Sequence, residues 1–134
     1  MAGPTLENVA DVYPLTATQQ GLLYHTLAAP QSEVYIEQMR GDLHNAPDDA
    51  LLQRAWQDIT NRHPALRTAF LWDGLDKPLQ VVRLKVTLPW QILDWSDRPA
   101  NDLDMMLEEL ARDERRVGFD LAQAPLMRLI LINL

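Results

Sequence analysis

The 134-residue sequence contains no cysteine, which excludes a disulfide framework, a thiolate nucleophile and a zinc–thiolate cluster. It has only five glycines, and they form no glycine-rich phosphate loop. Its two serines, Ser32 and Ser96, lie outside any Gly-x-Ser-x-Gly elbow. Serine hydrolases and nucleotide-binding proteins therefore lack their usual signals here. The absence of cysteine is typical of a reducing compartment, so we expect a cytoplasmic protein.

Basic residues are fewer than acidic residues. Twelve lysines and arginines against nineteen acidic residues give a formal net charge of −7. Because nucleic-acid affinity depends on clustered cations that release counterions, we expect no nucleic-acid partner. No apolar run is long enough to span a membrane, and the first residues lack the pattern of a signal peptide. We therefore expect no membrane partner either.

A chain of this length forms one domain or part of a larger one, and its 47% hydrophobic residues can supply a core. Between nine prolines, helical and strand-like patterns take turns. This alternation predicts an α/β or α+β fold, a mixed β-sheet flanked by helices rather than a bundle or a sandwich.

Three segments have helical patterns. Thr16 and Gln19 have the spacing of a capping box, which predicts a helix from about residue 16 to Pro30. Asp48 is a suitable N-cap for a second helix, whose apolar stripe ends before His63. A third helix is predicted to begin near 102–104, with an ion pair between Glu108 and Arg112 four residues apart.

Five runs have strand-like patterns, over 35–43, 66–72, 79–86, 90–93 and 126–134. Turn-forming residues between the second and third runs predict a hairpin. The last run is almost entirely apolar, which predicts a central strand covered on both faces. Because natural termini are usually polar and exposed, we expect the chain to be a truncated piece of a longer protein.

The three histidines lack the spacing of metal ligands, so we expect no metal site. His25 lies on an amphipathic helix, where packing or a surface hydrogen bond explains it. His44 and Asp48 match the H-x-x-x-D spacing of some acyltransferases, but the N-cap role explains Asp48 sufficiently. We therefore assign no catalytic residue.

Three motifs follow one another along the chain. Residues 12–25 read VYPLTATQQGLLYH, residues 62–70 read Arg-His-x-x-Leu-Arg-Thr-x-Phe, and Phe119-Asp120-Leu121 precedes Pro125-Leu126-Met127-Arg128. In order and spacing they resemble the condensation domains of nonribosomal peptide synthetases, whose fold is similar to that of chloramphenicol acetyltransferase. The resemblance covers almost the whole chain and implies one lobe of that fold.

The resemblance implies amide-bond formation between an acyl or peptidyl donor on an upstream carrier protein and an aminoacyl acceptor on a downstream one. Both substrates would ride on phosphopantetheine arms of these peptidyl carrier proteins, so no cofactor is expected to bind this chain directly. The family's His-His-x-x-x-Asp-Gly motif is expected just beyond Leu134. We therefore expect the 134-residue chain to be inactive by itself.

The resemblance also divides the chain and suggests roles for its residues. Residues 1–11 are expected to form a flexible N-terminal leader, and 12–134 the N-terminal lobe of a condensation domain, truncated before the catalytic motif. Structural support of the active site is expected from Arg62, His63 and Arg67, although solvated or capping cations are the simpler explanation for a helix end. The candidate channel-lining residues are Tyr13, Gln19 and Gln20, which a strand leading into a capped helix explains equally well.

Two alternatives stay open: a lobe of a related thioester-dependent acyltransferase, and a non-catalytic module that binds carrier proteins. The expected partners are the two carrier proteins and the remaining C-terminal lobe of the same domain. Without that lobe an apolar surface would be uncovered, so we also expect self-association.

Overall fold

The computed structural model describes residues 7–45 and 48–134, which form two sheets and three α-helices. The elements in chain order are β1 (Val9–Pro14), α1 (Ala17–Ala28), α2 (Asp49–Arg62), the 3₁₀ helix η1 (Pro64–Arg67), β2 (Thr68–Leu71), β3 (Leu79–Arg83), β4 (Trp90–Asp94), the 3₁₀ helix η2 (Ala100–Asp102), α3 (Leu103–Val117) and β5 (Leu129–Asn133).

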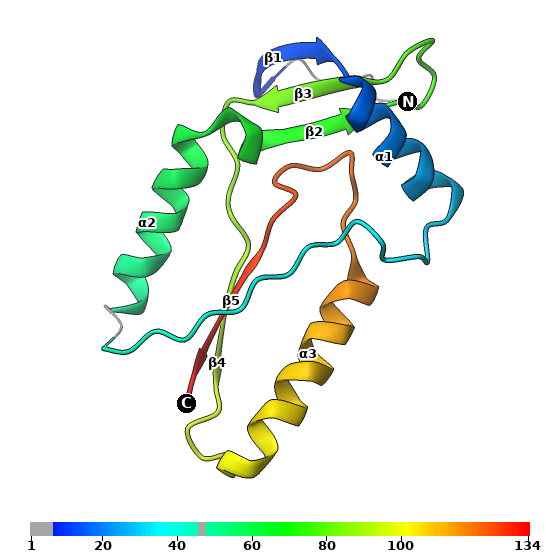
Figure 1. Ribbon diagram of the computed structural model, residues 1–134. Coiled ribbons are helices and arrows are strands. Elements are labelled where there is room, and N and C mark those ends of the chain that lie inside the picture. The colour runs from blue at the N-terminus through cyan, green and yellow to red at the C-terminus, as the bar shows by residue number, and fades with distance from the viewer. Residues whose placement is uncertain (1–6, 46–47) are drawn as a thin grey trace.

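The strands divide between an antiparallel sheet, in the order β1-β3-β2, and a parallel pair of β4 and β5. In Figure 1 the three-stranded sheet lies at one end, and α2, α3 and the β4–β5 pair extend away from it. The mixed fold of helices and strands is confirmed, although the strands form two sheets rather than one.

The start of α1 follows from the capping box. The Thr16 hydroxyl accepts from the Gln19 backbone N–H at 3.2 Å, and the Gln19 side-chain oxygen accepts from the Thr16 N–H at 2.8 Å. The helix ends at Ala28, shortly before Pro30, and its residue Leu23 is buried. The predicted helix is confirmed.

Local signals also set the bounds of α2. The Asp48 carboxylate accepts from the backbone N–H groups of Ala50 and Leu51, at 2.9 and 3.3 Å. The helix ends at Arg62 because Pro64 disfavours a helical conformation at the residue before it. The prediction for this helix is confirmed.

The predicted hairpin is confirmed, with strands shorter than the runs 66–72 and 79–86. Residues 64–67 form η1, and β3 ends at Arg83, where the chain leaves for the second sheet. Val81 and Val82 are consecutive residues of the central strand β3 and point to opposite faces, and both are buried, so each face of this strand is covered. In the part of the chain that the structure describes, the buried apolar residues are Leu15, Leu23, Ala69, Val81, Val82 and Leu88.

The strand predicted over 35–43 is absent from the structure. This segment connects α1 to α2 without joining either sheet, and Met39 is 99% exposed. Its side chains contact α3 instead: the Gln38 amide donates to the Ala111 carbonyl at 2.8 Å, and Arg40 lies 3.5 Å from Asp104. A strand needs a neighbouring backbone, and no described segment supplies one here.

The third helix is confirmed as α3, but no ion pair joins Glu108 to Arg112 in the described part of the chain. The last strand also differs from the prediction. Among residues 7–45 and 48–134, β5 pairs with β4 alone, so it is an edge strand there, and most of it is half-buried rather than covered on both faces.

The expected leader over 1–11 falls partly outside the described residues, which begin at 7. Within it, residues 9–11 belong to β1, where Val9 pairs with Arg83 of β3. The strand register shifts between Val9 and Asp11, as at a β-bulge. The ordered sheet therefore begins before the boundary expected at residue 12.

We predict that Thr16→Ala lowers the free energy of unfolding by about 1 kcal/mol, because it removes a helix N-cap. Urea denaturation followed by circular dichroism measures the change. Thr18→Ala is the matched control, since Thr18 is exposed within the same helix and should tolerate alanine. Equal loss of stability in both variants would contradict the assigned cap.

Candidate functional site

Arg67 anchors the segment through which the chain passes from one sheet to the other. Its Nη1 donates to the backbone carbonyls of Arg83 and Leu84, the latter at 3.3 Å. The Arg67 side chain is held at the end of η1, directly before β2. The second motif therefore places the Arg67 guanidinium against the backbone where the chain leaves β3.

Two other side chains hold the same segment. The Asn8 amide donates to the Lys85 carbonyl at 2.8 Å and accepts from its N–H at 2.7 Å. The Gln57 side chain in α2 donates to the Val86 carbonyl and accepts from the Leu88 N–H, both at 2.9 Å. Sequence reasoning missed Asn8 and Gln57, because their partners lie far away in the chain and no local pattern marks them.

Arg62 and His63 lie at the same corner but make different contacts. Both are exposed, and neither side chain has a hydrogen bond or ion pair within residues 7–45 and 48–134. His63 acts through its backbone, which donates to Ile59 and accepts from Leu66, both at 3.0 Å. The structure therefore brings Arg67 into a network and leaves Arg62 and His63 at the surface.

The candidate channel residues follow one another from β1 into α1. Gln19, besides its capping bond, lies 3.1 Å from the Gln80 side-chain oxygen in β3. The Gln20 amide donates to the Leu15 carbonyl at 3.3 Å. Gln19 alone of the three candidate channel residues borders the pocket described below.

Tyr13 is bonded to Asp11 two residues earlier on β1. Its hydroxyl donates to the Asp11 carboxylate at 2.6 Å. This hydrogen bond, together with one from the Val12 N–H, holds the pKa of Asp11 below its ordinary value, and it raises the pKa of Tyr13. Both groups are exposed and belong to the same edge strand, so their hydrogen bond does not join β1 to another element.

Arg128 fixes the chain just before β5. Its guanidinium pairs with the Glu114 carboxylate, donates to the carbonyls of Glu114 and Gly118, and lies 4.4 Å from the centre of the Phe119 ring. These contacts satisfy carbonyls at the end of α3. The third motif thus joins the end of α3 to the start of β5.

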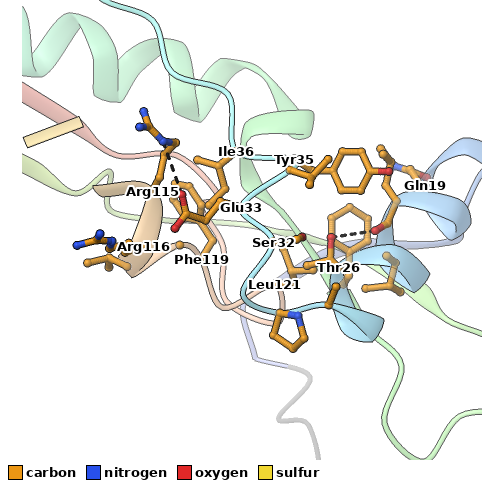
Figure 2. A pocket seen from close by; sticks show the side chains of 18 residues that line it. Gln19, Thr26, Ser32, Glu33, Tyr35, Ile36, Arg115, Arg116, Phe119 and Leu121 are labelled. Atoms are coloured by element: carbon orange, nitrogen blue, oxygen red, sulfur yellow. Dashed lines mark hydrogen bonds and ion pairs between the residues drawn. The ribbon is translucent and has the colours of Figure 1, made fainter. Parts of the chain in front are cut away.

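A pocket of about 330 Å³ lies between α1, the segment that follows it, and the end of α3. Figure 2 shows Glu33 and Arg115 facing each other across one side of it, at 3.7 Å. Phe70, Phe119 and Leu121 form part of the wall. The Phe70 N–H donates to the Leu121 carbonyl at 2.8 Å, which joins β2 to the loop after α3.

The histidines are separate from one another. The His25 ring lies 5.6 Å from that of Tyr24 and 6.4 Å from that of Tyr35, while His44 and His63 are exposed. Among the described residues, no cluster of three or more metal-ligating side chains occurs. Likewise, none of the described helices has the length and apolar character needed to cross a membrane.

Solved structures identify the class of fold. The chain superposes on a four-domain nonribosomal peptide synthetase bound to AMP and glycine with a TM-score of 0.72 and 19% identity, over 93% of this chain and 9% of that one. On the starter condensation domain of rhizomide synthetase the TM-score is 0.71 with 21% identity, over 92% of this chain and 30% of that one. The fold is that of a condensation domain, and the expected acetyltransferase-like lobe is confirmed.

Sequence comparison gives the family. The family model of the condensation domain matches residues 9–134, so the chain belongs to the condensation-domain family. A linear gramicidin synthase of Brevibacillus parabrevis is 42% identical over 93% of the chain, and bacitracin synthase 3 of Bacillus licheniformis is 28% identical over 93%. The chain spans only 2% of the length of either relative.

We predict that Arg67→Ala lowers the free energy of unfolding by about 1–3 kcal/mol, because it removes a charged donor from two backbone carbonyls. Arg62→Ala, the matched control, should change it by less than about 0.5 kcal/mol, since Arg62 is exposed. Urea denaturation of both variants checks this. Similar values for the two would show that the Arg67 contacts contribute no special stability.

We also predict that Tyr13→Phe raises the pKa of Asp11 toward its ordinary value, because the variant loses the main hydrogen bond to the ionised carboxylate. A lowered pKa adds stability above the unfolded-state pKa, and this contribution is lost as the pH falls through the folded-state pKa. Carbon-detected NMR titration of the carboxylate measures the change. Tyr24→Phe removes an exposed hydroxyl elsewhere and should leave Asp11 unchanged; an unaltered Asp11 pKa in Tyr13→Phe would refute the assignment.

Proposed function

We propose that this chain supplies the N-terminal part of a condensation domain that forms an amide bond between a carrier-bound acyl or peptidyl donor and a carrier-bound aminoacyl acceptor. The observation that carries the proposal is the family match over 9–134, supported by the position of the Arg62–Phe70 motif at the turn from α2 into β2. The chain corresponds to only part of the starter condensation-domain chain, so the whole reaction is assigned to a larger domain.

In this proposal Arg67 supports the active site indirectly. It holds the exit of β3, and the chain then continues to β4, the neighbour of β5. By family resemblance, a catalytic histidine would lie beyond the end of β5, and displacement of β4 would disturb its position. Arg62 and His63 would assist only through the shape of this corner, since their side chains are exposed.

The proposed reaction needs a histidine from outside these 134 residues. The sequence contains no His-His-x-x-x-Asp-Gly motif, and its three histidines lie apart. We assign no catalytic role to His25, His44 or His63, and we expect no turnover by the chain alone. One relative of the same fold, a mutant of the starter condensation domain of rhizomide synthetase, has a structure in complex with C8-CoA.

The proposed partners are upstream and downstream peptidyl carrier proteins, whose phosphopantetheine arms would carry both substrates in the cytoplasm. A further proposed partner is the rest of the same domain. The chain exposes 10089 Å² of surface, whereas a compact monomer of its size exposes about 7,100 Å². Uncovered apolar residues such as Leu51, Ile59 and Ile92 support a covering lobe, and self-association in its absence.

A chimeric domain tests the proposal. Residues 9–134 would replace the matching segment of a condensation domain from the linear gramicidin synthase compared above, and amide product would be measured by mass spectrometry with loaded donor and acceptor carrier proteins. We expect product from the chimera and none from the chain alone. Arg67→Ala in the chimera should lower the rate and the stability together.

The unaltered gramicidin synthase domain is the positive control, which should give amide product. Thermal denaturation shows whether the chimera folds. A folded chimera with no product would contradict the proposed function. A folded Arg67→Ala chimera with the stability and rate of its parent would contradict the supporting role of Arg67.

A further inference from the structure

The pocket between α1 and the end of α3 is bounded mainly by apolar side chains. Leu22 and Leu23 supply the α1 wall, Phe70 comes from β2, and Phe119 and Leu121 come from the loop after α3. The segment after α1 borders another side with Val34, which is 64% exposed. Pockets of this kind, apolar with a few polar groups at the edge, are typical ligand sites.

The polar groups around this pocket are almost all bonded within the chain. The Thr26 hydroxyl donates to the Leu22 carbonyl at 2.9 Å, and Gln19 is bonded to Thr16 and Gln80. Arg115 is bonded to Glu33 and to Gln38. A ligand with a strongly polar head would have to break these bonds, whereas an apolar ligand leaves them intact.

The charges around the pocket also balance. Arg115 and Arg116 contribute two positive charges and Glu33 one negative charge. Arg116 lies 3.7 Å from the Asp113 carboxylate, which supplies a second negative charge. The sum is close to zero, so the pocket offers no net attraction to an anion or a cation.

We propose that this pocket binds a small, neutral, apolar ligand, with an alkyl chain or aromatic ring in contact with Leu22, Phe70 and Phe119. Its volume of about 330 Å³ lies at the small end of ligand sites, enough for one ring or a short alkyl chain. The hydroxyls of Ser32 and Tyr35, both exposed residues of the lining, have no hydrogen-bond partner among the described residues, so either can bond a neutral polar group of the ligand.

One side of the pocket is held in a strained conformation. Glu33 has a φ of 56°, in the left-handed region that residues with a side chain rarely adopt. Its carboxylate lies 3.7 Å from Arg115, and this ion pair joins the segment after α1 to α3. The pair is present without a ligand, so this part of the wall needs less ordering on binding.

Three probes with similar eight-carbon chains and different charges test the proposal: octanamide, octanoate and octylamine. Each would be titrated into the isotope-labelled 134-residue chain, and amide NMR shifts would be followed. We expect saturable shifts at residues 32–36 and 118–121 with octanamide, with a dissociation constant in the millimolar range or below, on the order of what ten non-hydrogen atoms provide. The two charged probes should bind at least about ten-fold more weakly.

Leu22→Glu places a charge in the apolar wall and should weaken octanamide binding about ten-fold or more. Leu51→Glu is the matched control, because Leu51 is exposed on α2, away from the pocket, and should leave binding unchanged. Val34→Glu lies in the segment after α1, outside any helix, and provides a second test if Leu22→Glu fails to fold.

The proposal is overturned by the absence of saturable shifts with octanamide, by equal binding of a charged probe, or by equal weakening in Leu51→Glu. Shifts spread over other apolar surfaces would also overturn it. The proposal does not depend on amide-bond formation, and the titration involves no carrier protein. A negative titration would therefore leave the proposed amide-bond-forming function unaffected. Failure of that function would likewise leave the ligand proposal unaffected.

Discussion

The backbone of residues 83–88 leaves one sheet for the other, and the structure depends on how its polar groups are satisfied. Strand pairing ends at Arg83, so the following N–H and C=O groups need other partners. Side chains of Asn8, Gln57 and Arg67 supply them from the residue before β1, from α2 and from η1. These three elements are held together by contacts to one short segment. The position of β4, and through it that of β5, follows from this arrangement.

The elements that could be predicted are those whose signals are local. The capping residues Thr16 and Asp48 marked two helix starts, and the turn formers between β2 and β3 marked the hairpin. The failures concern strands, because a strand exists only where another backbone pairs with it. Residues 35–43 have a strand-like pattern but lie beside α3, and residues 126–134 have the pattern of a central strand, but β5 within them pairs on one side only among the described residues.

The residues of the site divide in the same way, between those that local sequence signals could indicate and those that depend on tertiary contacts. The resemblance selected Arg67, which the structure places in the network, together with Arg62 and His63, which remain at the surface. It selected Gln19, which borders the pocket, but it gave no indication of the ion pair between Glu33 and Arg115. That pair joins residues more than eighty positions apart, and charge patterns within one helix cannot reveal such partners. Side-chain roles that depend on tertiary contacts therefore required the structure.

The parallel pairing of β4 with β5 has a consequence for synthesis on the ribosome. The two strands are separated by η2, α3 and a loop, so β4 leaves the exit tunnel well before its neighbour exists. At typical elongation speeds of about 5–20 residues per second, β5 is synthesised roughly two to seven seconds after β4. During that interval the backbone edge of β4 is open to other extended peptides, and chaperones that shield such edges would act at this stage.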